Sequence, residues 1–273
     1  MIDSPFPDIS EIISFFGEAG QRLSEIDAIE GSAGNMSVFL GWQIDPRRQF
    51  PVEEIIQLPY DAPALINSTL LVSGSGRRLR EIIIDPAANL GALRIHADGK
   101  FGSLYTSPRR LFTRLTSELN SHLAVHNDQV SITKTNFHAI IHAQPPYLTF
   151  LSHIPRYRDE KYLNTHLLRW QPELIVNLPE GVGIVPFAVP SSQDLMTETL
   201  SSLCEHRIII WSKHGVVARS DMSIKKAADR IEYAETAARY EYMNLVCGEP
   251  ADGLSANEVL SICKAFDIQQ KIF

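Results

Sequence analysis

The chain has 273 residues, of which 44% are hydrophobic and 21% charged, a composition typical of one large or two small globular domains. Acidic residues outnumber basic ones by 32 to 25, so the net charge of −7 repels nucleic acid and anionic lipid. The mean hydropathy of −0.06 excludes a chain dominated by membrane spans. We therefore expect a small-molecule partner, and neither a nucleic acid nor a membrane.

The cysteines and the first residues predict the compartment. Cys204, Cys247 and Cys263 are far apart and form no CxxC pair, which argues against a disulfide framework and a thiolate zinc site. The opening sequence MIDSPFPDIS lacks the basic and apolar regions of a secretion signal. These features predict a cytoplasmic protein.

In the first part of the chain, periodicity predicts one amphipathic helix followed by short strands. Ile9, Ile12 and Phe16 follow helical spacing, after a cap at Asp8 or Ser10. A proline-containing stretch, 44–66, is expected to be a surface excursion. The expected strands, separated by turn signals, are 36–40, 70–72, 81–84, 92–95 and 102–105.

Helices and strands alternate in the second part of the chain. The expected helices are 117–128, capped by Ser117, then 146–153, 194–206, 223–248 and 255–266. The expected strands are 139–142, 174–178, 183–185 and 208–211. No internal repeat or sharp boundary divides the sequence, so residues 1–273 are predicted to form a single α/β domain.

Two histidines are candidate site residues, because imidazole binds metals and carries protons near neutral pH. His142 ends an apolar strand and His214 follows another, so both rings lie where a strand opens into a loop and can converge. The alternative is that each ring only caps its strand through a backbone hydrogen bond. Structural roles are the default for His96, His138, His153, His166 and His206.

One helical face carries Glu118, His122 and His126 at positions i, i+4 and i+8. A metal site on this face is conceivable, but helical drift carries His126 away from Glu118. A contact between Glu118 and His122, or simple exposure, is therefore favoured. Thr116 and Ser117 precede Glu118 at the start of the helix, where hydroxyls and free amides suit an anion.

The loop from Ser73 to Arg77, SGSGR, follows a strand and combines flexible backbone, hydroxyls and a guanidinium, which suits a phosphate ester. By itself such a loop is more often only a turn. The Walker, GxSxG, HExxH and dinucleotide-binding motifs are absent from the sequence. Their absence argues against those enzyme classes.

Seven segments, taken in order, resemble the class II aldolase/adducin family. They are GNMSV (34–38), LVSGSGR (71–77), DPAANLG (85–91), TSELNSHL (116–123), IIHAQPP (140–146), PEGVGIVP (179–186) and WSKHGV (211–216). This collinear set is more specific than any one motif. The resemblance implies a mixed, mainly antiparallel sheet flanked by helices, and a homotetramer with active sites at subunit contacts.

The resemblance also implies an activity. A divalent metal, zinc, polarises the carbonyl and hydroxyl of a ketose 1-phosphate, and retro-aldol cleavage releases dihydroxyacetone phosphate and an aldehyde. Glu118 matches the catalytic glutamate and Glu173 a second active-site carboxylate, while His142 and His214 match two metal ligands. The residues implied for phosphate binding are Asn35, Ser75, Gly76, Thr116 and Ser117.

The third metal ligand departs from the family pattern. The family has histidine two residues after His142, where this chain has Gln144. A glutamine carbonyl binds zinc more weakly than imidazole, which lowers both zinc affinity and Lewis acidity. Three interpretations stay open: a weakened zinc site, a different metal, or a repurposed protein that binds a sugar phosphate or acts as a scaffold. A pentulose 5-phosphate epimerase uses the same fold and metal site and ranks lower.

Overall fold

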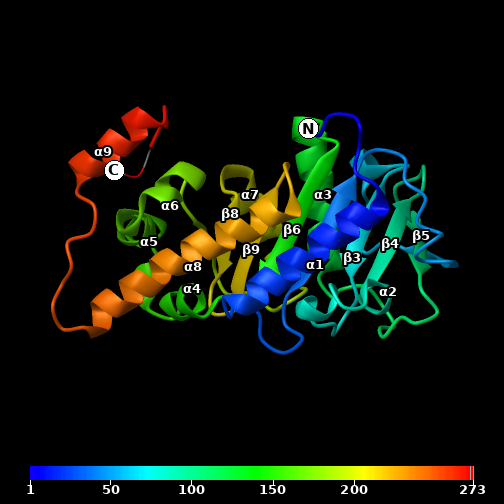
Figure 1. Cartoon of the computed structure of the whole chain (residues 1–273), viewed down its shortest axis with the longest axis horizontal. Helices are drawn as coiled ribbons and strands as arrows, with labels where there is room; N and C mark the ends of the chain where they lie inside the picture. Colours follow the sequence, from blue (N-terminus) through cyan, green and yellow to red (C-terminus); the bar gives the residue numbers. More distant parts are fainter. Residues whose placement is uncertain (271, 273) are drawn as a thin grey trace.

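A nine-stranded sheet forms the centre of the computed structural model, which describes residues 1–270 and 272 (Figure 1). The strand order is β2-β5-β4-β3-β1-β6-β9-β8-β7, and all neighbours are antiparallel except β7 and β8. The strands are β1 (Asn35–Leu40), β2 (Val52–Gln57), β3 (Thr69–Ser73), β4 (Leu90–Ile95), β5 (Phe101–Thr106), β6 (Phe137–Ala143), β7 (Gly183–Val185), β8 (Ile208–Trp211) and β9 (Gly215–Ser220). The predicted mixed, mainly antiparallel sheet is confirmed.

Helices cover both faces of this sheet. On one face, α1 (Ile9–Glu25) packs beside the long α8 (Ile224–Val246), and Figure 1 shows both lying across the strands. On the other face lie α3 (Leu119–Thr133) and α7 (Gln193–Glu205). The remaining α-helices are α2 (Pro86–Asn89), α4 (Pro146–Leu151), α5 (Glu160–Leu167), α6 (Pro172–Asn177) and α9 (Ala256–Ala265). Among the described residues, no helix combines the length and apolarity needed to cross a membrane.

The central strands are buried on both sides because helices cover both faces. Met36 and Val38 of β1 join the core beneath α1 and α8, whereas Phe39 packs with Leu123 on the α3 side. Successive side chains of a strand point to opposite faces, which explains this division. β1 and β6 are therefore buried at every position, including at their polar residues Ser37 and His138.

Helix starts are largely where the sequence places them. Asp8 caps α1 and forms a capping box with Glu11, which settles the choice between Asp8 and Ser10. Ser223 caps α8, and Ser255 caps α9 in a second capping box. The expected cap at Ser117 is wrong, because α3 begins one residue later, with Glu118 at the N-cap position and without a side-chain capping bond.

Two expected strands are wrong. Residues 81–84 begin at the last residue of the 3₁₀ helix η2 (Leu79–Glu81), and of the three isoleucines here only Ile82 is buried, so no strand face forms. Residues 174–178 lie mostly in α6, whose first residue is Pro172. Proline at that position favours a helix start because its fixed φ suits the first turn.

Two strands were missing from the sequence prediction. β2 lies within the stretch 44–66, expected to be a surface excursion, and it pairs with β5 at the edge of the sheet. Its side chains are largely exposed, so it lacks an apolar signature. β9 follows directly on His214 and pairs with both β6 and β8.

The register of the central strands positions the residues of the site. Asn35, at the start of β1, lies opposite His142, near the end of β6. His142 in turn lies opposite Val217 of β9. The turn between β8 and β9 contains His214, so two strand ends and one turn meet at the same edge of the sheet.

Candidate active site

A cleft of about 230 Å³ lies at this edge of the sheet. It gathers the predicted metal ligands, the predicted phosphate-binding residues and Glu118. Its lining consists of Ser32, Ala33, Gly34, Asn35, Gly74, Ser75, Gly76, Thr116, Ser117, Glu118, His142, Gln144, Pro190 and His214. Residues separated by as many as 182 positions, from 32 to 214, thus share one hollow.

Glu118, His142 and His214 lie together at one end of the cleft. Their candidate ligand atoms all lie within 4.8 Å of one another, and the two imidazole centroids are also 4.8 Å apart. His142 Nδ1 donates to the carbonyl oxygen of Val216 at 2.9 Å, which leaves its Nε2 lone pair free. His214 Nδ1 is buried and has no partner among the described residues. Two imidazoles and a carboxylate fit a divalent cation.

Both interpretations of the strand-end histidines hold for His142. Its ring converges with that of His214, and it also bonds to the backbone of the neighbouring strand. The backbone bond orients the ring toward the cleft instead of replacing a site role. Trp211 packs against both rings, with centroids 4.7 Å from His142 and 5.2 Å from His214.

The electrostatics of this end favour metal-binding protonation states. Burial acts to raise the pKa of Glu118, but His142, the hydrogen bond from Asn35 and two further imidazoles outweigh it and lower that pKa. Burial lowers the pKa of His214 to about 4, with a further contribution from His142. At neutral pH the carboxylate is therefore ionised and the His214 imidazole neutral, as metal binding requires.

Gln144 lies in the cleft beside the two imidazoles. Its backbone amide donates to the carbonyl of Ala28 at 2.7 Å, while its side-chain amide has no hydrogen bond to any described residue. A Cβ at Gly215 would lie 2.4 Å from the carbonyl oxygen of Ala143 and 3.0 Å from Gln144 Cγ. Glycine at position 215 thus allows this close approach of β9 to the end of β6.

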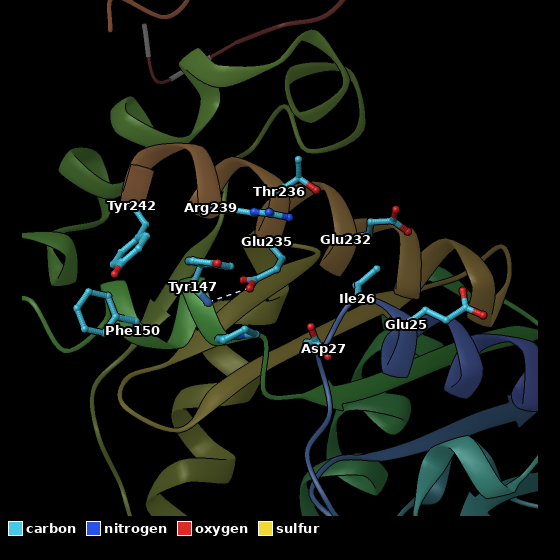
Figure 2. Close-up of a pocket in the computed structure, with 11 residues that line it drawn as sticks. Glu25, Ile26, Asp27, Tyr147, Phe150, Glu232, Glu235, Thr236, Arg239 and Tyr242 are labelled. Atoms are coloured by element: carbon cyan, nitrogen blue, oxygen red, sulfur yellow. Dashed lines mark hydrogen bonds between the residues drawn. The ribbon is translucent and has the colours of Figure 1, made fainter. Parts of the chain in front are cut away.

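A hollow between α1, α4 and α8 contains a carboxylate that supports the loop after Gln144 (Figure 2). The Glu235 oxygens accept the backbone N–H groups of Tyr147 at 2.8 Å and Leu148 at 2.9 Å. Burial raises the pKa of Glu235 to about 7, against the opposing effects of these bonds and of Arg239. Glu235 therefore anchors the chain three residues beyond Gln144.

The other end of the cleft consists of two loops with free donors. The amide of Ser75 donates to Arg114 at 2.9 Å and that of Thr116 donates to Ser73 at 3.0 Å, which ties the loops together. Within the described part of the chain, the amides of Gly76 and Ser117 and the Ser75 hydroxyl have no partner. Donors that converge before a helix N-terminus form a suitable anion site.

Arg77 does not take part in this end of the cleft, contrary to the expectation from the SGSGR loop. Its guanidinium donates to Asn89 at 2.8 Å and to Glu81 at 2.9 Å. Glu81 ends the short helix η2, four residues after Arg77, and the two side chains form an ion pair.

The structure brings together nine of the ten predicted site residues. Glu173 is the exception: it is exposed in the first turn of α6 and does not line the cleft within one chain. Its role stays a prediction. Pro190 lines the cleft and was not predicted, because a proline in an irregular stretch carries no chemical signal. Ser32 also lines the cleft, as does Gly34, the first residue of the segment GNMSV that resembles the family.

The expectation of exposure for His122 and His126 is wrong. His122 is 2% exposed and His126 is fully buried. The expected contact between Glu118 and His122 is also not direct, because the amide of Asn35 lies between them. The helical face that begins at Glu118 therefore leads from the cleft into the core.

The chain belongs to the class II aldolase and adducin family. The family described as "Class II Aldolase and Adducin N-terminal domain" matches residues 16–242. The chain is similar to the rhamnulose-1-phosphate aldolase of Yersinia pseudotuberculosis, with 28% identity over 244 residues, which cover 88% of this chain and 87% of the relative. The rhamnulose-1-phosphate aldolase of Yersinia pestis matches over the same length at the same identity.

Solved structures agree with this assignment. A sugar-phosphate aldolase from Thermotoga maritima is 26% identical, with a TM-score of 0.76 over 89% of this chain and 98% of that one. An L-fuculose-1-phosphate aldolase from Thermus thermophilus has a TM-score of 0.54 over 88% of this chain and 98% of its own length. At 16% identity, that second likeness shows the fold alone.

Proposed function

We propose that the protein is a metal-dependent aldolase that cleaves a ketose 1-phosphate resembling L-rhamnulose 1-phosphate into dihydroxyacetone phosphate and an aldehyde. The observation that carries this proposal is the meeting of Glu118, His142 and His214 beside a loop pair with free amide donors. The family and its rhamnulose-1-phosphate aldolase relatives support the same class of reaction.

His142, His214 and Glu118 would hold the cation, and the side-chain oxygen of Gln144 would add a weak fourth ligand. When bound, a divalent cation such as zinc supplies a Lewis acid for the carbonyl and hydroxyl of the ketose. The backbone bond from His142 to Val216 keeps that imidazole in the tautomer and orientation needed for binding. Because Gln144 replaces an imidazole, we expect reduced affinity for zinc.

Glu118 is the proposed acid–base group. In cleavage, the bond between C3 and C4 breaks, its electron pair stays on C3, and the C4 hydroxyl loses its proton as it becomes the aldehyde. C3 must then take up a proton. Glu118 is 4% exposed and ionised at neutral pH, so in cleavage it accepts the proton released from the C4 hydroxyl and delivers it to C3, and in synthesis it carries the proton in the opposite direction.

The phosphate of the substrate would bind at the opposite end of the cleft. Ser75, Gly76, Thr116, Ser117 and Asn35 supply hydroxyl and amide donors there. The start of α3 adds its partial positive charge. This division leaves the reacting carbons between the phosphate and the imidazoles.

The complete enzyme is proposed to be a cytoplasmic homotetramer. Glu173 is exposed and outside the cleft of its own chain, so a role in catalysis requires a neighbouring copy that places it at the site. Sedimentation of the purified protein tests this point, and a monomer mass would contradict it.

The test of the proposed function is release of dihydroxyacetone phosphate from L-rhamnulose 1-phosphate by the full chain, after chelator treatment and after zinc is restored. Zinc-dependent turnover is expected. Turnover that survives complete removal of metal would contradict the proposal. Binding of the sugar phosphate without cleavage at any zinc concentration would instead favour a repurposed binding protein.

Gln144→His sharpens this test because it restores the imidazole of the family pattern. We expect zinc affinity to rise by at least about tenfold, since loss of an outer-shell partner alone costs about 10–100-fold. Gln21→His, on the exposed surface of α1, is the matched control and should leave zinc affinity unchanged. Equal zinc affinity in both variants would show that position 144 is not a ligand position.

A further inference from the structure

A series of hydrogen bonds leads from the candidate acid–base group into the core beneath α3. Its members are all at least nine-tenths buried and none is a candidate metal ligand. The series, called the imidazole chain below, consists of Asn35, His122, Ser37, His126 and His138.

The contacts of the imidazole chain are short and continuous. Asn35 Oδ1 lies 2.5 Å from His122 Nε2, and His122 Nδ1 lies 2.5 Å from Ser37 Oγ. Ser37 Oγ lies 2.7 Å from His126 Nε2, and His126 Nδ1 lies 2.8 Å from His138 Nδ1. Each contact needs one hydrogen, and a neutral imidazole carries one donor and one acceptor. Ser37 has a single hydrogen to donate, so the direction of the bond at the Asn35 end determines the direction of all the others.

The end of the imidazole chain at the cleft selects one direction. Asn35 Nδ2 donates to Glu118 Oε2 at 2.8 Å. Reversal of the amide would place Asn35 Oδ1 against the carboxylate, so two acceptors would face each other. With the observed orientation, His122 Nε2 donates to Asn35, Ser37 donates to His122 Nδ1, and His126 Nε2 donates to Ser37.

The end of the imidazole chain at His138 favours the same direction of hydrogen-bond donation. His138 Nδ1 then donates to His126, which leaves a lone pair on His138 Nε2, an atom that is buried without a partner in the described part of the chain. The guanidinium groups of Arg219 and Arg230 are close enough to contribute to a pKa of about 3 for His138, which is set mainly by burial. A lone pair near positive charge is favoured over an N–H group at that place.

The rings are held in the neutral form that this arrangement needs. Burial lowers the pKa of His122 to about 4 and that of His126 well below its usual range. The neighbouring imidazole of His138 contributes to the shift at His126. At neutral pH each ring therefore keeps one donor and one acceptor.

We propose that His122, Ser37, His126 and His138 are positioning residues that orient the Asn35 amide, with its NH₂ group toward Glu118 and the phosphate end of the cleft. This inference rests on the proposed function, since it assigns a task within the same site. Asn35 lines the cleft and has two N–H groups, of which Glu118 takes one. The other is left for the substrate phosphate, while His122 covers the oxygen that would repel it.

Ser37→Ala is the first test, because it removes the middle of the imidazole chain without touching the cleft. We expect kcat to fall about tenfold and KM for the ketose phosphate to rise several-fold. Ser37→Thr retains the hydroxyl and should recover most of both values. Ser68→Ala removes another buried hydroxyl, which lies just before β3 and donates to the carbonyl of Leu65, and should keep both values within about twofold.

The second test determines the direction of the hydrogen bonds from the histidine tautomers, and it does not depend on catalytic activity. Solid-state NMR of protein with ¹⁵N-labelled histidine distinguishes the two neutral tautomers. The proposal requires the proton on Nε2 in His122 and His126 and on Nδ1 in His138. Opposite tautomers, or folded Ser37→Ala with unchanged kcat and KM, would overturn it. If the parent protein cleaves no ketose phosphate, the proposed function fails. The positioning role is then still decided by the histidine tautomers and by comparing the affinity of Ser37→Ala and of the parent for inorganic phosphate.

Discussion

Helices α1 and α3 lie on opposite faces of the same sheet and use their buried positions differently. The buried face of α1 is entirely apolar or glycine: Ile9, Ile12, Ile13, Phe16, Gly17, Ala19, Gly20 and Leu23. The buried face of α3 also contains Ser121, His122, His126 and Gln129. Apolar burial stabilises in proportion to area, whereas a buried hydrogen bond adds little net stability but is strongly directional. The comparison indicates that α1 mainly supports the fold and α3 mainly orients the site.

The largest expected effect comes from the carboxylate at the start of α3. Glu118→Gln keeps the side-chain shape but removes the acid–base group, so we expect kcat to fall by about 10²–10⁴-fold. The matched change in α1 is Glu11→Gln, because glutamine still completes the capping box with Asp8. Steady-state kinetics of both variants test the comparison. An active Glu118→Gln variant would remove Glu118 from the proposed mechanism.

A change in α1 is expected to have the opposite result, because it should lower stability and leave kcat unchanged. Phe16 is fully buried, so Phe16→Ala is expected to lower the free energy of unfolding by about 3–5 kcal/mol. Because this side chain contacts the core and not the cleft, kcat of the folded fraction should stay near that of the parent. Urea unfolding and active-site-normalised kinetics measure the two quantities. A large loss of kcat in fully folded protein would show that α1 also orients the site.

The buried imidazoles beneath α3 predict a pH dependence of stability. Burial, with Arg219 and Arg230, lowers the pKa of His138 to about 3, whereas a histidine in the unfolded chain titrates near 6.5. Between these values the unfolded state binds more protons, so the free energy of unfolding falls as the pH is lowered. His138 alone should account for a loss of about 2 kcal/mol between pH 7 and pH 5.

Urea unfolding of His138→Gln at pH 7 and pH 5 measures this contribution. The difference between the two pH values should be smaller than in the parent by about 2 kcal/mol. His153→Gln, at an exposed position, is the control and should show the parent's difference. If His138→Gln and His153→Gln show the same difference between the two pH values, His138 accepts a proton in the folded protein and the prediction is wrong.

The smallest expected effect is a difference in stability between variants at the starts of α1 and α3. The Asp8 carboxylate accepts the amides of Ser10 at 2.7 Å and Glu11 at 2.9 Å, so Asp8→Ala should cost about 1 kcal/mol of stability. Ser117 makes no capping bond to α3, and Ser117→Ala should cost less than about 0.5 kcal/mol. Thermal unfolding of the two variants tests this order, and a larger loss for Ser117→Ala would contradict it.

Much of the site was predictable because its residues lie at strand ends and in recognisable segments. The apolar run 139–141 places His142 at the end of a strand, and the strand before His214 is equally clear. The loop 73–77, predicted to suit a phosphate ester, follows a strand in the same way. These features are local, so the sequence contains the information needed to place them.

The burial of His122 and His126 was not predictable, because polar residues on a helix usually face solvent. Their environment depends on Ser37 and His138, which approach them from β1 and β6 in the folded sheet. The position of Glu173 relative to the cleft likewise depends on contacts beyond its own segment. Partners that are distant in sequence leave no local pattern.

The close approach at Gly34 and Gly215 has a consequence for how such a site diversifies. A Cβ at Gly34, where φ is +85°, would lie 2.9 Å from the carbonyl oxygen of His142, and a Cβ at Gly215 would collide with Ala143. The backbone around the imidazoles therefore tolerates few substitutions. The half-buried side chain at position 144 lines the cleft, so a substitution there changes the lining without moving that backbone. Under the proposed function, single substitutions at 144 would thus let metal preference drift during evolution, while the frame that holds His142 and His214 is inherited intact.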